Sequence, residues 1–378
     1  MRKVLLVPDS FKGTMSSSEV CSIMSSAILK YYPQVNIIAI PVADGGEGSV
    51  DCFLRASGGV KMTVQVKNPL FEDMQAFYGV LDKRETAIVE MAACAGLPLI
   101  EDRKDPLGST TYGVGELILD AAQKGAKKII VALGGSATND GGCGAACAIG
   151  VRFFNAAGES FIPTGGTLKE IAGIDTTCRN ESLCGVEIIS MCDIDNPMYG
   201  PQGAAYVFGP QKGATPDMLA VLDANLKHLS EVIKCDLGKD ISAVPGAGAA
   251  GAMGAGMLAF FDAKLQMGIE TVLDTVAFDE LVKGADMVFT GEGKIDRQSL
   301  RGKVVIGVAR RAKNANVPVV AIVGDIGDDI EAAYDEGVSS MISINRVAVD
   351  FSQARERAKS DMALTMDNFL RFLLRMGL

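Results

Sequence analysis

Two short segments share the pattern Asp-Gly-Gly-x-Gly, and each follows an apolar run. The first kernel starts at Asp44 in PVADGGEGS, and the second starts at Asp140 in ALGGSATNDGGCGAA. Glycines between a strand and a helix let the backbone turn sharply and direct several N–H groups toward an anion. The adjacent carboxylate would repel a phosphate unless a cation lies between them. The two kernels therefore indicate a metal–phosphate site, and a tight turn capped by Asp is the alternative for either kernel alone.

Three further segments place charged or polar side chains after apolar runs, with Lys212 in the glycine- and proline-rich loop that follows one of them. They are Asp9, Ser10 and Lys12 in VPDSFKG, Asp193, Asp195 and Lys212 in CDIDNPMYGPQGAAYVFGPQKGA, and Glu292, Lys294 and Asp296 in VFTGEGKID. The carboxyl ends of parallel strands are the positions at which α/β sheets bind ligands. The pattern thus predicts binding or catalytic groups, although an Asx turn before Asn196–Pro197 and a solvated charged loop are the alternatives.

The segment PGAGAAGAMGAG contains a formal G-x-G-x-x-G from Gly246 to Gly251. A dinucleotide fingerprint requires a strand directly before it, whereas KDISAVP is polar and ends in proline. The composition favours a glycine- and alanine-rich helix that packs closely on a neighbour, with its start facing a phosphate as a further option. A P-loop motif, G-x-x-x-x-G-K-[ST], does not occur in the sequence.

Composition excludes several classes of function. The 378 residues include a single histidine, His228, so Ser-His-Asp triads and His-based zinc sites lack their parts. The formal net charge of −10 argues against nucleic-acid and membrane-surface binding. Nine cysteines without disulfide-scaffold spacing predict reduced thiols and a cytoplasmic protein. The N-terminal MRKVLLVPDS is typical of a first strand rather than of a signal peptide.

The elements that must position these residues follow from hydrophobic periodicity. Apolar strands alternate with helices near both ends of the chain, with a capping box at Ser16 and Glu19 opening the first helix, and this predicts a parallel sheet. The middle begins with the period-two segments VKMTVQVKN, QAFYGVLD and ETAIVEM, which predict antiparallel strands. We therefore expect an α/β protein in which residues 1–58 plus 286–378 form one domain. Residues 59–285 form an inserted mixed α/β domain, with the active-site cleft between the two.

Seven of these segments together resemble the bacterial class I glycerate kinases. They are PDSFKGTMSSSEV, PVADGGEGS, ALGGSATNDGGCGA, CDIDNP, FGPQKGA, VPGAGAAGAMGAG and TGEGKIDRQSLRGK. The resemblance extends from about Val4 to beyond Val323. It implies a flavodoxin-like α/β domain with a second α/β domain inserted. It also implies transfer of the γ-phosphoryl group of ATP, with Mg²⁺, to a hydroxyl of D-glycerate, giving 2-phosphoglycerate and ADP.

The resemblance suggests roles for residues already singled out. Asp193 is the expected base for the glycerate hydroxyl, with Lys12 and Asp44 as further catalytic candidates; Lys12, Lys212 and Lys294 offset negative charge, with Arg297 and Arg301 as weaker candidates. Expected metal ligands are Glu47, Asp140, Asp195 and Asp296. Expected substrate or nucleotide contacts are Asp9, Ser10, Gly45, Gly46, Ser136, Asn139, Gly141, Gly142, Lys212, Gly246, Gly248, Gly291, Glu292 and Lys294.

Three alternatives to a glycerate 2-kinase are kept. The first is a kinase that forms 3-phosphoglycerate. The second is an NAD-dependent hydroxy-acid oxidoreductase that uses the Gly246 segment. The third is a non-catalytic glycerate sensor, for which the clustered carboxylates would be unnecessary. We expect a monomer or homodimer acting on small molecules.

Overall fold

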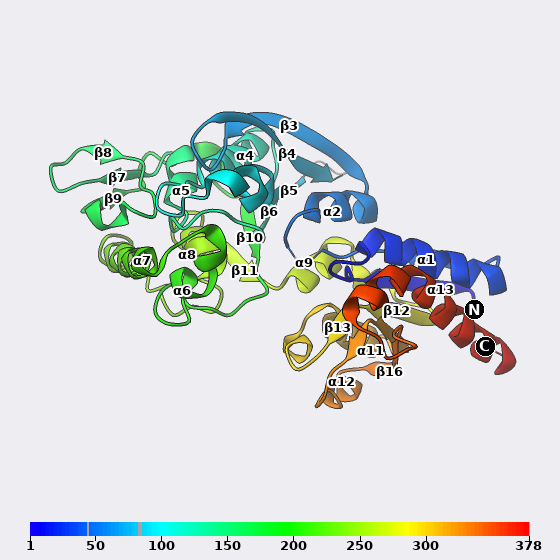
Figure 1. Cartoon of the computed structure of the whole chain (residues 1–378). Helices are drawn as coiled ribbons and strands as arrows, with labels where there is room; N and C mark the ends of the chain where they lie inside the picture. The colour runs from blue at the N-terminus through cyan, green and yellow to red at the C-terminus, as the bar shows by residue number, and fades with distance from the viewer. Residues whose placement is uncertain (44, 82–84, 378) are drawn as a thin grey trace. The chain divides into compact units, whose positions relative to one another are not determined.

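The computed structural model describes residues 1–43, 45–81 and 85–377, which form two compact units (Figure 1). Unit 1 comprises residues 1–44, 55–57 and 267–378, and unit 2 comprises residues 45–54 and 58–266. The N- and C-terminal segments of the chain therefore fold together, and the middle of the chain folds separately. Helix α2, Ser49–Ser57, is divided between the units.

A five-stranded sheet forms the centre of unit 1. Its order is β16-β14-β12-β1-β2, and every neighbouring pair is parallel. Counted along unit 1 alone, this is the order 2-1-3-4-5 of flavodoxin-like folds. The strands are β1 (Lys3–Pro8), β2 (Asn36–Ala39), β12 (Met287–Gly291), β14 (Val319–Val323) and β16 (Val338–Ser343). The prediction of a flavodoxin-like parallel sheet is confirmed.

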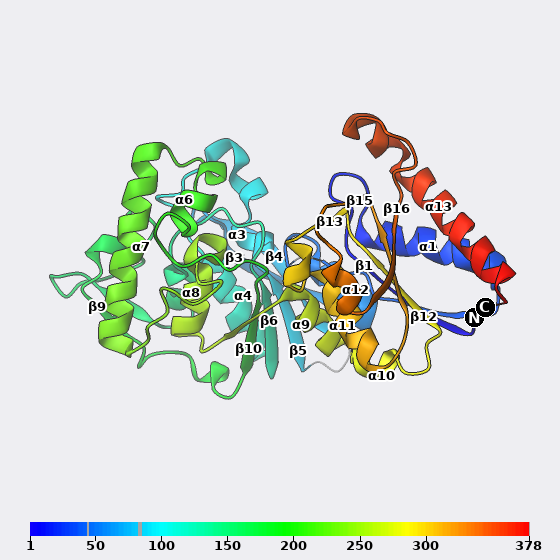
Figure 2. The ribbon, with the colours of Figure 1, turned by 90° about the horizontal axis from the view of Figure 1, so that it is seen from below.

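Helices cover both faces of this sheet. On one face α1 (Ser17–Tyr31) and α13 (Phe351–Arg375) lie side by side (Figures 1 and 2). Their buried side chains, among them Met24 and Met366, belong to one apolar cluster with Leu6 of β1. The predicted capping box of Ser16 and Glu19 is present at the start of α1. The remaining elements of unit 1 are α9 (Gly268–Thr275), α10 (Phe278–Leu281), β13 (Lys294–Ile295), α11 (Val304–Asn314), β15 (Asp325–Ile326) and α12 (Ala332–Asp335).

Unit 2 contains a six-stranded mixed sheet. Its order is β11-β10-β6-β5-β4-β3. The β3–β4 and β4–β5 pairs are antiparallel, as the period-two pattern predicted, and the other pairs are parallel. The strands are β3 (Gly59–Lys67), β4 (Asp73–Leu81), β5 (Thr86–Glu90), β6 (Lys128–Ala132), β10 (Glu187–Met191) and β11 (Lys264–Gln266). A small sheet contains β7 (Arg152–Phe154), β8 (Ser160–Phe161) and β9 (Gly173–Asp175).

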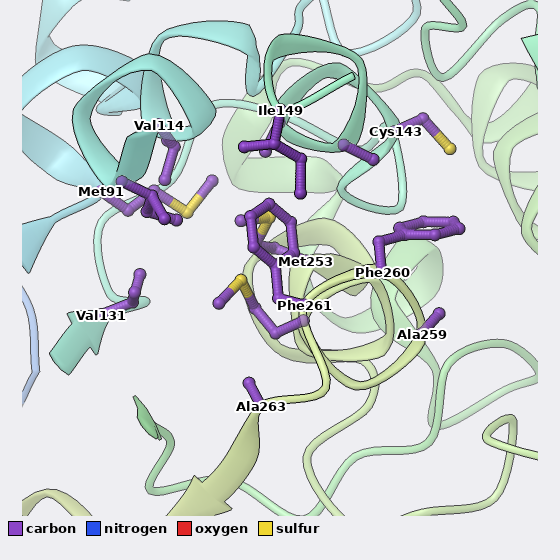
Figure 3. Packing of buried hydrophobic residues seen from close by; sticks show 14 of the residues in the cluster. Met91, Val114, Val131, Cys143, Ile149, Met253, Ala259, Phe260, Phe261 and Ala263 are labelled. Carbon is purple, nitrogen blue, oxygen red and sulfur yellow. The ribbon is translucent and has the colours of Figure 1, made fainter. Parts of the chain in front are cut away.

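The core of unit 2 surrounds one apolar helix, α8 (Ala249–Phe260). Its residues Met253 and Phe260 are buried, and Figure 3 shows them among apolar side chains from several elements, including Met91 and Ile149. The rings of Phe260 and Phe153 meet edge to face, with centroids 5.5 Å apart. A helix that is apolar on all sides belongs in a core. The helices of unit 2 are α3 (Ala92–Ala95), α4 (Tyr112–Gln123), α5 (Cys143–Ala148), α6 (Ala204–Phe208), α7 (Pro216–Leu237) and α8 (Ala249–Phe260).

The single histidine and one of the nine cysteines both have structural roles in unit 2. His228 lies on α7, where its Nε2 is 2.8 Å from the carbonyl oxygen of Ile171. Cys143 is fully buried in α5, and burial raises the pKa of its thiol well above the usual range. None of the described helices has the length and apolar composition needed to cross a membrane.

Candidate active site

Unit 1 gathers several predicted residues at the carboxyl ends of β1 and β12. These two strands are neighbours, with Pro8 paired to Gly291, and the next residue, Asp9, donates its amide to the Gly291 carbonyl at 2.8 Å. The Asp9 carboxylate in turn accepts the amide of Ser10 at 2.6 Å. In a 2-1-3-4-5 sheet this is the topological switch point, where ligands bind. Asp9, Ser10 and Gly291 therefore lie where a flavodoxin-like sheet binds its ligand.

Glu292 follows Gly291 and is buried, with 8% of its surface exposed. Its Oε1 atom has no hydrogen-bond partner. Burial raises the pKa of the Glu292 carboxyl to about 7, and the nearby charges of Asp9 and Asp296 act in the same direction. A carboxyl group that titrates near neutrality, with one oxygen unsatisfied, can donate or accept a proton or hold a ligand.

Lys294 and Asp296 line a shallow hollow in unit 1 of about 360 Å³. Arg297 and Asp329 line it too and form an ion pair of 2.6 Å. The Asp296 carboxylate accepts the amide of Gln298 at 2.8 Å. The hollow therefore combines basic and acidic groups. Lys12 is exposed in the loop that follows β1.

The first glycine kernel packs on the loop that follows β6 in unit 2. The Gly45 carbonyl accepts the amide of Gly134 at 2.8 Å. A Cβ atom on Gly134 would lie only 2.6 Å from the Cα of Gly46, so glycine is required at this approach. Gly45 itself has φ of +79°. Two segments that the sequence separates by about ninety residues are thus in direct contact. Asp44 lies outside the described residues.

The N-terminus of α2, which follows the first kernel, already holds a carboxylate. Glu90, at the end of β5, accepts the amide of Gly48 on Oε1 at 3.0 Å and the amide of Val50 on Oε2 at 3.2 Å. Glu90 is only 3% exposed. Sequence reasoning missed this residue, because ETAIVEM was interpreted only as a strand. The available signal was a carboxylate in an apolar run, which burial obliges to find donors.

In the second kernel Asp140 is fully buried, and its carboxylate accepts several hydrogen bonds. Oδ2 accepts the amide of Thr111 at 2.8 Å, its hydroxyl at 2.9 Å and the amide of Gly144 at 3.2 Å, while Oδ1 accepts the amide of Gly142 at 3.1 Å. Burial raises the pKa of Asp140, and these bonds oppose the increase. Thr111 carried no signal in the sequence.

The backbone amides of the second kernel are satisfied within the protein. Gly141 donates to the Gly251 carbonyl at 3.2 Å, and Ala145 donates to the Thr111 hydroxyl at 2.9 Å. The amides between them, at 142, 143 and 144, all donate to Asp140. An anion could bind to these amides only by displacing internal bonds. The structure thus gives this kernel the capped-turn geometry that was the alternative interpretation, while its binding role stays a prediction.

Lys212 is brought to the same loop from the segment FGPQKGA. Its Nζ donates to the Ser136 hydroxyl at 2.8 Å and to the Thr138 carbonyl at 2.6 Å. Lys212 is 1% exposed, and burial lowers the pKa of its amine to about 7. Nearby, the hydroxyl of Thr138 and the amide group of Asn139 are buried without partners. This polar cluster is therefore costly to bury and fixes the SATND loop.

The glycine-rich segment that opens α8 packs on two of the predicted loops. A Cβ atom on Gly248 would lie 2.2 Å from the Pro197 carbonyl oxygen, and one on Gly251 would lie 2.0 Å from the Thr138 carbonyl oxygen. The amide of Gly248 donates to the carbonyl of Asn196 at 3.0 Å. The expectation of a helix in close packing is confirmed. A finding beyond the prediction is a left-handed turn inside this segment, with positive φ at three consecutive residues: Ala250, Gly251 and Ala252.

The remaining predicted groups lie after β10. Asp193 is half-buried, and Asp195 is exposed two residues later. Gly246 approaches the same segment, since a Cβ atom there would lie 2.8 Å from the Sγ of Cys192. Glu47, a predicted metal ligand, is exposed. Over the part of the chain that the structure describes, no three His, Cys, Asp or Glu side chains are grouped to hold a metal ion.

Comparison with known proteins decides the family. The sequence profile described as "Glycerate kinase family" matches residues 4–374. This chain belongs to the glycerate kinase family. It is 43% identical to the glycerate kinase of Bacillus cereus over 97% of this chain and 96% of that one. It is 42% identical to the glycerate 2-kinase of Escherichia coli K12 over 90% of each chain.

A solved structure agrees with the fold. The crystal structure of a candidate glycerate kinase 2 from Salmonella typhimurium LT2 matches with a TM-score of 0.87 and 38% identity, covering 100% of this chain and 99% of the other. The protein is therefore a kinase, an enzyme that transfers a phosphoryl group, and family membership implies ATP as a substrate. These findings favour the kinase over the oxidoreductase and the sensor.

Proposed function

We propose that this glycerate kinase family member transfers the γ-phosphoryl group of ATP to the 2-hydroxyl of D-glycerate, giving 2-phosphoglycerate and ADP. The observation that carries the proposal is similarity along nearly the whole chain to proteins named glycerate kinase, including a relative named glycerate 2-kinase. Phosphoryl transfer needs positioned groups, charge neutralisation and an acceptor base, and these requirements do not include histidine.

Asp193 is our proposed base. In this role its carboxylate takes the proton of the glycerate hydroxyl, whose oxygen forms the new bond to the γ-phosphorus. The bond between that phosphorus and the bridging oxygen of ADP breaks, and ADP leaves with the electron pair. Asp193 is half-buried and lies two residues beyond Met191, the last residue of β10, so the end of a strand positions it.

Further residues are proposed to bind and orient the substrates. In unit 1 the groups at the switch point, Asp9, Ser10 and Glu292, together with the cations Lys12 and Lys294, are assigned to the nucleotide. In unit 2 Lys212 fixes Ser136 and the SATND loop, which are assigned to substrate contacts. These assignments follow from strand ends and charge, because a net charge of −10 makes local cations necessary for anion capture.

Mg²⁺ fits the oxygen-rich set of side chains. It is usually held by one or two carboxylates together with substrate phosphates, so a preformed group of three is unnecessary. When bound, it neutralises charge on the phosphates. Exposed or half-buried carboxylates, which leave oxygens accessible, suit this role: Glu47, Asp195 and Asp296. Asp140, whose carboxylate already accepts four bonds, is better suited to support the loop.

Phosphorus NMR of the reaction product tests the proposal. Purified protein incubated with D-glycerate and MgATP should yield the resonance of 2-phosphoglycerate together with ADP. A 3-phosphoglycerate resonance would support the alternative kinase. Absence of phosphoryl transfer to glycerate under conditions in which the protein is folded would contradict the proposed function.

A further inference from the structure

We propose that Glu90 is a positioning residue for this phosphoryl transfer: its buried carboxylate fixes the Gly45–Val50 segment by binding the amides of Gly48 and Val50. The inference rests on the proposed function, which assigns Glu47 of the first glycine kernel to Mg²⁺. Glu90 was not among the residues selected from the sequence. It acts through the backbone of the kernel and is not assigned a contact with substrate.

The geometry is that of a helix N-terminus with its anion already in place. Each carboxylate oxygen of Glu90 accepts one amide, from Gly48 at 3.0 Å and from Val50 at 3.2 Å. Gly48 is the N-cap of α2, and no side chain caps the helix from that position. The first amides of a helix need acceptors and attract negative charge. Glu90 therefore occupies the position that a phosphate would otherwise take at this helix.

The strand that carries Glu90 is a neighbour of β6, whose following loop also contacts the first kernel. Glu90 is the last residue of β5 and pairs with Ala132, the last residue of β6. Two residues beyond Ala132, the amide of Gly134 donates to the Gly45 carbonyl at 2.8 Å. The kernel is thus held at Gly45 by the loop after β6 and at Gly48 by the end of β5. Neighbouring strands of one sheet set both contacts.

The charge of Glu90 is specifically suited to this task. Burial raises the pKa of its carboxyl, the amides of Val50 and Gly48 lower it, and the charges of Glu47 and Asp51 raise it again. Glutamine has the same shape but only one acceptor oxygen, and its amide NH₂ would face a backbone N–H. Glu90→Gln therefore removes one hydrogen bond and places the side-chain NH₂ donor against a backbone N–H donor, while the volume of the side chain stays the same.

Two measurements on the full-length protein test the role, with Glu116→Gln as the matched control. Glu116 is another carboxylate of unit 2 that accepts a backbone amide, from Lys67 at 2.7 Å; it is half-buried, and burial raises its pKa. Hydrogen exchange of the 45–54 peptides should be faster by about tenfold or more in Glu90→Gln at Gly48 and Val50. Glu116→Gln should leave this exchange at the wild-type rate.

The kinetic measurement separates positioning from stability. In Glu90→Gln, kcat for glycerate should fall by about tenfold or more, because displacement of a site by about 1 Å has effects of this size. The KM for glycerate should change by less than about threefold. In Glu116→Gln, kcat should stay within about twofold of wild type despite a similar shift in melting temperature.

The outcomes distinguish the two proposals. If the wild type is active, two results would contradict the positioning role alone. One is hydrogen exchange in Glu90→Gln at the wild-type rate, and the other is a kcat of Glu90→Gln equal to that of Glu116→Gln. A wild type that phosphorylates no glycerate contradicts the proposed function, and the positioning role falls with it. The exchange comparison needs no substrate, so in that case it still shows whether Glu90 holds the kernel.

Discussion

The amine of Lys212 donates a 2.8 Å hydrogen bond to the hydroxyl of Ser136, which lies 76 residues earlier in the chain. A second bond, of 2.6 Å, reaches the Thr138 carbonyl. A buried lysine is costly unless it is hydrogen-bonded, so this pair is strong evidence that the FGPQKGA and SATND segments act as one structural element. The sequence suggested both residues as ligand contacts, and the structure adds that they bind each other.

Replacing Lys212 with methionine should damage the loop and the enzyme together. The Thr138 carbonyl and the Ser136 hydroxyl would lose their buried donor, which costs about 1–3 kcal/mol in the free energy of unfolding. We expect kcat/KM for glycerate to fall at least about a hundredfold. Lys239→Met is the control, since Lys239 bonds the Ala259 carbonyl at 2.7 Å in a different part of unit 2. Equal activity of the two variants would contradict the prediction.

Lys212 should also give stability a characteristic pH dependence. The pKa of its amine is lowered from 10.5 to about 7 by burial. Between these pH values the unfolded chain binds a proton that the folded protein does not, so the free energy of unfolding rises with pH across this range. Urea unfolding at pH 7 and pH 9.5 should show a smaller rise in Lys212→Met than in wild type. Identical rises would show that the buried amine keeps its ordinary pKa.

Glu292 should make the free energy of unfolding fall as pH rises, at lower pH than the effect of Lys212. Burial raises the pKa of its carboxyl from 4.5 to about 7. Between these values the folded protein holds a proton that the unfolded chain has released, so this group loses stabilising effect as pH rises. In thermal melts, the melting temperature of Glu292→Gln should rise relative to that of wild type from pH 5 to pH 8. Glu280→Gln, which replaces an exposed carboxylate of unit 1, should show no such relative rise. A constant difference would contradict the assignment.

The left-handed turn in α8 predicts that glycine stabilises position 250 and that alanine destabilises position 251. Ala250 and Ala252 adopt φ of 56° and 64°, which costs an L residue about 1–2 kcal/mol. Ala250→Gly should therefore raise the free energy of unfolding by up to about 1 kcal/mol. Gly251→Ala should lower it by at least about 2 kcal/mol, because the added Cβ atom would lie 2.0 Å from the Thr138 carbonyl oxygen. Chemical denaturation of both variants checks the pair.

Asp193→Asn tests the proposed base. Loss of a general base should reduce kcat by about 100- to 10,000-fold while the melting temperature stays close to that of wild type. Asp236→Asn, an exposed carboxylate that accepts the Ile174 amide at 2.9 Å, should retain activity. Near-normal turnover in Asp193→Asn would remove this residue from the mechanism.

Local patterns were enough to predict the frame of the fold. The capping box at Ser16 and Glu19 and the period-two strands β3 and β4 were found correctly because each depends on neighbouring residues or on burial of one face. The flavodoxin-like order was implied by family resemblance rather than by periodicity, because strand order depends on contacts between distant segments.

The two glycine kernels show where sequence reasoning stopped. Their pattern is the same, yet the first has positive φ at Gly45 and Gly48, and the second at Gly141 and Gly142. The acceptors of their backbone amides also differ. The first kernel uses Glu90, 42 residues from Gly48, whereas Asp140 accepts the amides of its own kernel and of Thr111, 29 residues away. Such distant partners are invisible in a short motif.

The discontinuity of unit 1 has a consequence during synthesis. Val4 of β1 pairs with Met287 of β12, so β1, an inner strand of the sheet, emerges from the ribosome long before its second neighbour exists. At about 5–20 residues per second the delay is roughly 15–60 s. During that time the apolar β1 has only β2 beside it, and residues 58–266 can complete a core of their own. Because of this topology, the cell must keep β1 from aggregating until β12 has been synthesised.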